Sequence, residues 1–367
     1  MARLDDICAI NMGQSPDSAS YNENGEGMPF FQGNADFGKI HPKVRVWCSA
    51  PTKIAYAGDV LISVRAPIGA MNIADRECCI GRGLAALTVN EGLCVKDYLW
   101  YAIASKVDEL NSKGTGSTFK AISKGVLAET EIPLPDLNEQ KKIAEQLAKV
   151  DGLIAARKEQ LTKLDQLVKS RFIELFNEWK CEPAPLKTFL NDITYGFTNP
   201  MPDATEGPWK ITAKDVVNRK VNYGTARKTT LEAFEELTAK SKPSVGDVLL
   251  TKDGTLGRCA VVETDGLCVN QSVAVLKCNE RIVPKFLAIL LQMPEYQKEM
   301  LKNAGGGTIK HIYITKVVDM LIAVPTQSQQ LDFLSFVEQT DKSKLVIQQS
   351  LDKLEMLKKS LMQEYFG

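Results

Sequence analysis

The sequence predicts an α+β protein in which one building block, a mixed globular domain followed by a long helix, occurs twice. Two observations lead to this prediction: a repeat at a nearly constant offset, and an apolar pattern of helical period at the end of each repeat. Short aliphatic runs bounded by Gly, Pro and Asn in the globular parts are typical of strands. We therefore expect domains at 1–135 and 179–325, and long helices at 136–178 and 326–367.

The repeat is clearest in the helical parts. Residues 135–176 align without a gap with residues 325–366, at an offset of 190, so that Gln140 pairs with Gln330 and Asp151 with Asp341. The match continues upstream, where three further strings align: 57–69 with 245–257, 79–87 with 268–276, and 116–122 with 306–312. Leu4-Asp5-Asp6-Ile7 and Leu190-Asn191-Asp192-Ile193 are a weaker echo at the start of each half. The repeating unit is therefore larger than one helix.

Within the globular parts, strands and helices follow from local composition. We expect strands in four runs, at 59–64, 247–250, 259–262 and 272–276. Apolar residues at helical spacing predict one helix in each domain, at 96–111 and at 284–303. Each domain is then of the mixed α+β class.

The long helices carry their own start signals and an apolar seam. Asp136 with Glu139, and Thr326 with Gln329, stand at capping-box spacing after a proline. In the first helix one apolar stripe recurs every seven residues, at Leu147, Ile154, Leu161, Val168 and Leu175. A second stripe, at Ile143, Val150 and Leu164, is interrupted by Arg157. The second helix keeps apolar residues but admits polar ones: Ile347, Leu351, Leu354 and Leu361 against Thr340, Lys344 and Lys358. Such a seam needs a partner, and the other copy is the nearest.

Length and composition place the chain among globular proteins. With 367 residues, 44% hydrophobic and 25% charged, two or more domains are expected. No run of 18 apolar residues occurs, and the first residues, Met-Ala-Arg-Leu-Asp-Asp, are charged where a signal peptide would be apolar. We therefore expect a cytoplasmic protein that does not enter a membrane.

The nine cysteines do not have the spacing of a metal site or a disulfide framework. Cys78 and Cys79 are adjacent, no Cys-x-x-Cys occurs, and the two histidines, His41 and His311, are far apart. A zinc site needs paired ligands at short spacing. Reduced, mostly buried thiols are the better interpretation, and no metal site is expected.

The charge balance argues against a uniformly basic surface. Lys plus Arg number 45 and Asp plus Glu number 45, so any affinity for DNA phosphates must come from local basic regions. One candidate is residues 209–228, with six cations and one acid beside Trp209 and Tyr223: Lys210, Lys214, Arg219, Lys220, Arg227, Lys228 and Asp215. A solvated loop face is the equally weighted alternative.

Several strings resemble the specificity subunit of type I restriction-modification enzymes. They are the tail Ile132 to Pro135, the helix opening LNEQKKIAEQL, and upstream PFFQGNAD, GDVLISVRAPIG and CIGRGLAAL, with the unit repeated along essentially the whole chain. The resemblance implies two target-recognition domains held apart by two long helices, packed as an antiparallel coiled coil with pseudo-two-fold symmetry. Each domain would read one half of a split site in double-stranded DNA.

The same resemblance implies that the chemistry belongs to partner subunits. Two DNA-adenine methyltransferase subunits, with or without two restriction subunits, would use S-adenosylmethionine, ATP and Mg²⁺, and this chain would hold no cofactor. The sequence contains neither an Asn/Asp-Pro-Pro-Tyr/Phe string nor a P-loop, so we expect no enzyme activity. A coiled-coil scaffold with globular heads, and a self-contained nuclease or methyltransferase, are the alternatives.

Side chains that pair with base edges or phosphates are the candidate DNA contacts. Glycines with hydroxyls and lysines fill loops 113–120 and 303–311, whose alternative interpretation is a flexible turn. The two halves diverge at two places. The first half has RAPIG where the second has residues 252–257, and it has Gly81-Arg82 where the second has Asn270-Gln271. The predicted DNA-binding residues are Arg65, Arg82, Lys113, Thr115, Ser117, Lys120, Lys210, Lys214, Arg219, Lys220, Lys252, Arg258, Asn270, Gln271, Thr308 and Lys310.

Overall fold

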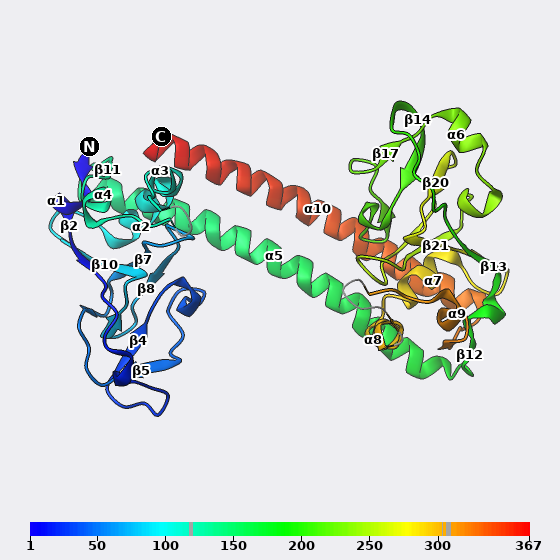
Figure 1. The fold of residues 1–367 in the computed structure, drawn as a ribbon, viewed down its shortest axis with the longest axis horizontal. Helices are drawn as coiled ribbons and strands as arrows, with labels where there is room; N and C mark the ends of the chain where they lie inside the picture. Colours follow the sequence, from blue (N-terminus) through cyan, green and yellow to red (C-terminus); the bar gives the residue numbers. More distant parts are fainter. Residues whose placement is uncertain (117–119, 303, 306–309) are drawn as a thin grey trace. The chain divides into compact units, whose positions relative to one another are not determined.

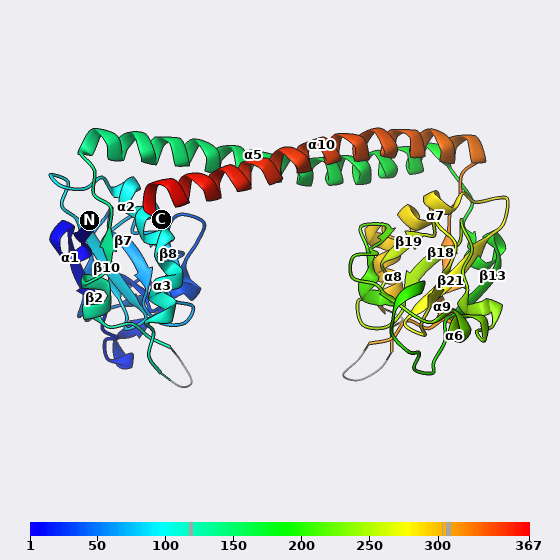
Figure 2. The same ribbon diagram turned by 90° about the horizontal axis from the view of Figure 1, so that it is seen from above.

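The computed structural model describes residues 1–116, 120–302, 304–305 and 310–367, and these form two compact units (Figures 1 and 2). The first unit contains Met1–Glu159 and Ile347–Gly367, and the second contains Gln160–Val346. Both long helices, α5 (Leu137–Trp179) and α10 (Gln327–Phe366), cross the boundary between the units. Each unit therefore combines one globular domain with a part of both helices.

The domain of the first unit contains two sheets. An antiparallel sheet has the order β2-β10-β7-β8, with these bounds: β2 (Cys8–Met12), β10 (Leu84–Val89), β7 (Val60–Ser63) and β8 (Met71–Ile73). The other sheet has the order β3-β5-β4-β9-β6, with these bounds: β3 (Tyr21–Asn22), β5 (Val46–Cys48), β4 (Met28–Phe31), β9 (Cys78–Ile80) and β6 (Ile54–Ala55). In it, β4 and β9 are parallel, with Phe30 opposite Cys79.

Short elements complete this domain. Its helices are α1 (Leu4–Ile7), α2 (Lys96–Ser105), α3 (Val107–Ser112) and α4 (Lys124–Ala128). Strands β1 (Ala2–Arg3) and β11 (Glu131–Ile132) pair antiparallel and bring the start of the chain beside the segment that leads into α5.

The domain of the second unit repeats this plan. Its antiparallel sheet has the order β13-β21-β18-β19, with these bounds: β13 (Leu190–Tyr195), β21 (Val273–Cys278), β18 (Val248–Thr251) and β19 (Cys259–Val261). A sheet of order β17-β14-β20 again has a parallel pair, with these bounds: β17 (Arg227–Lys228), β14 (Ala204–Ile211) and β20 (Leu267–Val269). Two strand pairs complete it: β12 (Ala184–Pro185) with β22 (Leu321–Ile322), and β15 (Val216–Val217) with β16 (Lys220–Val221). Its helices are α6 (Leu231–Glu235), α7 (Pro284–Leu290), α8 (Pro294–Lys302) and α9 (Ile314–Val317).

Strand β18 explains why the sequence has continuous aliphatic runs rather than an alternating pattern. Val248 and Leu250 pack with Phe286 of α7 on one face of the strand, whereas Leu249 packs with Ile211 of β14 on the other. Since successive side chains of a strand point to opposite faces, a strand covered on both faces must be apolar at every position. The strand is thus the centre of a three-layer domain.

The structure corrects two details of the predicted elements. The echo at the start of each half is four residues out of register, because α1 corresponds to a 3-10 helix at Leu186–Phe189 and not to Leu190, which begins β13. Each predicted domain helix is also broken in two. The second ends at Leu290 and restarts at Pro294, which has no N–H to donate and disfavours a helical conformation in the residue before it; the first changes direction at Lys106.

In each unit the two long helices run antiparallel and bury the predicted seam. In the first unit, Lys358 of α10 donates to Asp151 of α5 at 2.6 Å, and Tyr365 donates to Gln146 at 2.8 Å. Four α5 positions of the predicted stripes are buried there: Ile143, Leu147, Val150 and Ile154. The lysine that interrupts the apolar pattern is therefore neutralised by an aspartate of the facing helix.

The second unit has the same arrangement at its end of the helices. Lys344 of α10 donates to Asp165 of α5 at 2.5 Å. Further along, the ring centroids of Phe172 and Phe333 lie 5.5 Å apart, in a core that also contains Phe286 of the domain. This aromatic core fixes the end of α5 to the start of α10.

Two aspartates at repeat-equivalent positions connect the helices to their domains through different partners. Asp151 accepts from the Tyr101 hydroxyl at 3.1 Å and from Lys358. Burial, and then the charge of Asp151, raise the pKa of Tyr101, so the phenol stays protonated and donates. Asp341 instead accepts two hydrogen bonds from Nη2 of Arg219, at 2.9 and 3.0 Å.

A buried glutamine fastens the start of α5 to the first domain. Gln140 is fully buried and accepts from the Val95 backbone N–H at 2.8 Å. Its Nε2 donates to the carbonyl oxygens of Leu93, at 3.1 Å, and of Pro135, at 2.8 Å. Asp136 caps the helix through the Glu139 backbone N–H.

The second domain contains the same clamp. Gln330 is fully buried, accepts from the Val283 N–H at 2.8 Å, and donates to the carbonyl oxygens of Arg281 and Pro325 at 3.0 and 2.9 Å. Each amide therefore connects three parts of its unit: the loop before a domain helix, the turn before the long helix, and the long helix itself.

We expect Gln140→Leu to destabilise the first unit by about 1–3 kcal/mol, because the partly buried Val95 N–H and the Leu93 and Pro135 carbonyls would lose their hydrogen-bond partner. The measurement is urea unfolding followed by circular dichroism, with limited proteolysis to identify which unit opens first. Gln146→Leu is the matched control: Gln146 is exposed on the same helix and accepts one hydrogen bond, so its loss should cost about 0.5 kcal/mol or less. Equal stabilities of the two variants would contradict the clamp.

Candidate nucleic-acid interface

Three segments that are far apart in the sequence converge at one edge of the first domain. The Val64 N–H donates to the Gly83 carbonyl at 2.9 Å, next to Arg82. On the other side, the Ala66 N–H donates to the Lys120 carbonyl at 3.0 Å, and Arg65 forms a β-bridge with Ala121. The structure thus brings the predicted contacts Arg65, Arg82 and Lys120 together, and all three side chains are exposed.

The second domain builds the same edge from the equivalent segments. The Lys252 N–H donates to the Ser272 carbonyl at 2.8 Å, and the Ile312 N–H donates to the Lys252 carbonyl at 2.8 Å. Asp253 forms a β-bridge with His311, which is equivalent to the bridge between Arg65 and Ala121 in the first domain. Asn270, Gln271 and Lys310 therefore lie along this edge.

The residue at the bridged position has the opposite charge in the two domains. Arg65 is exposed, whereas the Asp253 carboxylate contacts His311 Nδ1 and accepts from Lys252 Nζ at 3.0 Å. The Lys252 side chain is only 8% exposed and also lies over the Tyr195 ring, 5.3 Å from its centroid. Lys252 is thus held inside the edge and is not a free surface cation.

The basic segment 209–228 is only partly available to a ligand. Lys210 donates to Asp203 at 2.6 Å and to the Met201 carbonyl at 3.0 Å, and Arg219 is bound to Asp341. The hydrogen bond from Lys210 is the main cause that lowers the pKa of Asp203. Of the four predicted contacts here, the exposed side chains are those of Lys214 and Lys220.

The remaining predicted contacts differ in their surroundings. Lys113 donates to Glu109 at 2.6 Å, while Thr115, Lys120 and Lys310 are exposed. Arg258 donates to the Val216 carbonyl at 3.5 Å. Asn270 Oδ1 accepts from the hydroxyl and the N–H of Ser272, and Gln271 is exposed. Ser117 and Thr308 lie outside the described residues.

The described part of the chain offers no site for a metal ion. No group of three His, Cys, Asp or Glu side chains gathers among the described residues, and all nine cysteines are free. Burial raises the pKa of Cys78 to about 12 and that of Cys268 to about 11, so these thiols stay protonated and are poor ligands. The prediction that the thiols are mostly buried is confirmed, since seven of the nine cysteines are buried.

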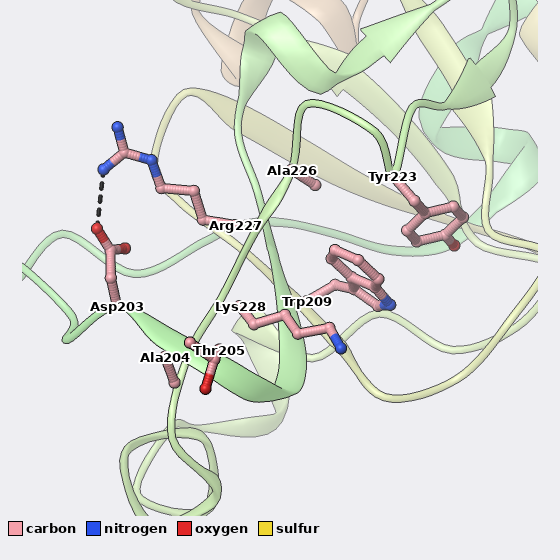
Figure 3. Close-up of a pocket in the computed structure, with 8 residues that line it drawn as sticks. All are labelled: Asp203, Ala204, Thr205, Trp209, Tyr223, Ala226, Arg227 and Lys228. Atoms are coloured by element: carbon pink, nitrogen blue, oxygen red, sulfur yellow. Dashed lines mark hydrogen bonds and ion pairs between the residues drawn. The ribbon is translucent and has the colours of Figure 1, made fainter.

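A surface pocket of about 440 Å³ lies beside the three-stranded sheet of the second domain (Figure 3). Its walls include the rings of Trp209 and Tyr223 and the cationic side chains of Arg227 and Lys228. The predicted site did not include Arg227 and Lys228, although both belong to the basic segment that composition singled out. Asp203 also lines the pocket, and its pairing with the segment could not be read from sequence spacing.

Comparison with known proteins identifies the family. The model described as "Type I restriction modification DNA specificity domain" matches residues 1–166 and again residues 177–356. The chain therefore belongs to the family of type I restriction modification DNA specificity domains. The two matches correspond to the repeat found in the sequence.

Individual relatives agree with this assignment. The putative type I restriction enzyme MjaX specificity subunit of Methanocaldococcus jannaschii is 42% identical over 160 residues, which are 44% of this chain and 38% of that protein. This alignment spans less than two fifths of that relative's length. The type I restriction enzyme EcoBI specificity subunit of Escherichia coli is 24% identical over 381 residues, covering 92% of this chain and 78% of that protein.

A solved structure shares the fold over the whole chain. The crystal structure of the type I restriction-modification system S subunit from M. genitalium is 15% identical, with a TM-score of 0.55 over 100% of this chain and 95% of that one. The predicted fold class, two mixed domains each followed by a long helix, is confirmed. In the described residues, every helix is too short or too polar to span a membrane.

We expect Asp253→Ala to destabilise the second unit by about 1.5–3 kcal/mol, because the buried Lys252 ammonium would lose its carboxylate partner. The double variant Asp253→Ala/Lys252→Met should recover part of this loss. The control is Asp319→Ala, whose pair with Lys187 at 2.7 Å is exposed and should be worth under about 1 kcal/mol. Thermal unfolding of the four proteins is the measurement, and equal losses for both single aspartate variants would refute the buried pair.

Proposed function

We propose that the chain is the DNA sequence-specificity subunit of a type I restriction-modification complex. The observation that carries this proposal is the edge formed twice by equivalent backbone segments but with different side chains. Arg65 stands in the first domain where Asp253 stands in the second, and Arg82 falls in the segment that aligns with Asn270-Gln271. A constant scaffold with variable side chains is what two readers of different half-sites require.

The side chains at these edges are suited to base edges in the major groove. Arginine donates two hydrogen bonds to guanine, asparagine and glutamine pair with adenine, and a carboxylate accepts from the amino group of cytosine. The exposed Arg82 and Gln271, which occupy aligned positions in the two domains, would then favour different bases at the corresponding position of each half-site. Each domain reads one half of a bipartite, asymmetric target.

Phosphate contacts supply affinity but little sequence information. Exposed lysines are suited to this role: Lys120 and Lys310 at the edges, and Lys214 and Lys220 in the basic segment of the second domain. Because the whole chain has 45 basic and 45 acidic residues, these local cations must compensate for a surface without net positive charge.

The chemistry of modification and restriction belongs to partners in this proposal. Two adenine methyltransferase subunits bind the chain, with or without two restriction subunits, and these partners use S-adenosylmethionine, ATP and Mg²⁺. This chain holds no cofactor and has no catalytic residue. The resemblance of the sequence supports these assignments, and it also supports a cytoplasmic location without membrane contact.

A coiled-coil scaffold that does not read DNA is the alternative function. The buried seam of α5 and α10 suits both functions, so the seam does not distinguish them. The doubled edge favours DNA reading, since a scaffold gains nothing from repeating a backbone edge while varying its side chains.

We expect that replacing residues 1–130 with the corresponding segment of another family member changes one half of the recognised DNA sequence and preserves the other. The full chain, reconstituted with its methyltransferase subunits, is tested by genome-wide mapping of methylated adenines. The reciprocal control replaces residues 179–325 and should change only the other half. Loss of specificity in both halves from either exchange would contradict one domain per half-site.

The purified chain alone should neither methylate nor cut DNA when S-adenosylmethionine, ATP and Mg²⁺ are supplied. The same preparation should become active in methylation when the methyltransferase subunits are added. Incorporation of labelled methyl groups and gel analysis of the DNA are the measurements. Turnover by the chain without partners would show that it is itself an enzyme.

A further inference from the structure

The pocket of the second domain has aromatic walls that are held in place. The Trp209 and Tyr223 ring centroids are 5.3 Å apart with planes inclined by 55°. Tyr223 is fixed by a hydrogen bond of 2.8 Å between its hydroxyl and that of Thr264, and Trp209 is anchored in β14 opposite Leu267. The rings therefore form a preorganised corner that a flat group can enter without reordering the protein.

Cations surround this aromatic corner. Lys228 Nζ lies 4.8 Å from the centroid of the Trp209 ring, and Arg227 borders the pocket while donating to Asp203 at 2.8 Å. Asp203 also binds Lys210, so this carboxylate is paired with two cations and leaves Lys228 without an acidic partner among the described residues of the pocket. A ligand with both a flat aromatic part and a negative charge matches the corner and its charges.

The strand that carries Trp209 leads from the pocket to the proposed DNA edge. Ile211 lies two residues after Trp209 on β14, and its carbonyl accepts from the Asn270 N–H at 3.1 Å. Ala213 follows and donates to the Ser272 hydroxyl at 3.1 Å. At about 3.3 Å per residue of strand, Trp209 is roughly 7 Å from this edge. A DNA strand on the edge can therefore place one nucleotide in the pocket.

We propose that this pocket binds a single DNA nucleotide whose base has left the helical stack. The base stacks on Trp209 beside Tyr223, and its phosphate is bound by Lys228. This proposal rests on the proposed function, because it requires DNA at the neighbouring edge.

Lys228 has two positions in this proposal. Without DNA it covers the indole, and a solvated cation–ring contact is weaker than the stacking of a base on the same ring. A base can therefore displace the ammonium, which remains close enough to bind the phosphate of the same nucleotide. The cation protects the apolar ring from solvent until DNA arrives.

The first domain does not repeat this corner. Pro29 is paired with Trp47 across β4 and β5, at the step where the second domain pairs Trp209 with Lys228. Cys79 and Cys268 align in the repeat, and the residues opposite them on the parallel strands are Phe30 and Lys210. Pro29 in the first domain therefore corresponds to Trp209 in the second. The tryptophan is thus on the opposite strand in the first domain, and we assign the nucleotide pocket to the second domain alone.

The test uses the full chain and two fluorescent duplexes that differ only by a one-nucleotide bulge containing 2-aminopurine. We expect tighter binding of the bulged duplex and quenching of 2-aminopurine when it stacks on Trp209. Trp209→Ala should lower affinity for the bulged duplex about tenfold and leave the paired duplex within twofold. Trp209→Phe should retain most of the preference, and Lys228→Gln should lose part of it.

Phe234→Ala is the matched control, because Lys242 lies 4.9 Å from the Phe234 ring centroid in the same domain but outside this pocket. It should leave both affinities unchanged. If Trp209→Ala fails to fold, the comparison of Lys228→Gln and Trp209→Phe with the wild type by 2-aminopurine quenching still decides the outcome.

The outcomes separate this proposal from the proposed function. Paired-duplex binding without a bulge preference, or equal losses on both duplexes in Trp209→Ala, overturns the nucleotide pocket and leaves DNA reading intact. Bulge binding through Trp209 without any binding of paired DNA contradicts the proposed function, and it also overturns the placement of DNA on the neighbouring edge from which the nucleotide would enter the pocket. Absence of binding to either duplex overturns both.

Discussion

The direction in which each long helix leaves its domain depends on one buried amide, Gln140 in the first unit and Gln330 in the second. Each side chain satisfies one backbone N–H and two carbonyl groups in buried or partly buried surroundings, where an unpaired polar group costs free energy. An apolar residue of the same size could fill the space but could not replace these three hydrogen bonds. Because the clamps are alike, the helices begin alike, and the domains are free to differ at their far edges.

The basic segment 209–228 indicates how a protein without net charge could still offer a local site for a polyanion in the proposed function. Cations near the surface are sorted by nearby acids: Lys210 and Arg219 are bound within their unit, whereas Lys214 and Lys220 are exposed. A charged side chain that is already bound would have to break an ion pair before it could neutralise a phosphate. The distribution of acids, more than the number of bases, therefore determines which cations of this segment would be available to DNA in the proposed function.

The repeat, the bounds of the long helices and the seam were predictable because each is a local periodic pattern. Pro294, which marks the break in the second domain helix, is present in the sequence. Because the apolar residues on both sides of it keep helical spacing, the prediction joined them into one helix. The pairing of Arg219 with Asp341, 122 residues away, could not be foreseen, nor could that of Lys210 with Asp203, because each depends on tertiary packing. The alignment of residues 57–69 with 245–257 already sets Arg65 against Asp253, but the bridge that places Asp253 opposite His311 depends on tertiary packing and became apparent only in the folded domain.

The aspartate by which each long helix binds its globular domain limits how these domains can be exchanged between proteins in evolution. An exchange of the first domain would remove Tyr101, but Asp151 would still bind Lys358, so an arginine arriving with a domain of the second kind would have to share its acceptor with this lysine. A domain of the first kind, placed beside Asp341, would bring a tyrosine to an aspartate whose present partner is Arg219. Successful shuffling then requires inheritance of a domain together with a few residues of the helix that receives it, and natural crossover points should fall within the helices and not at their ends.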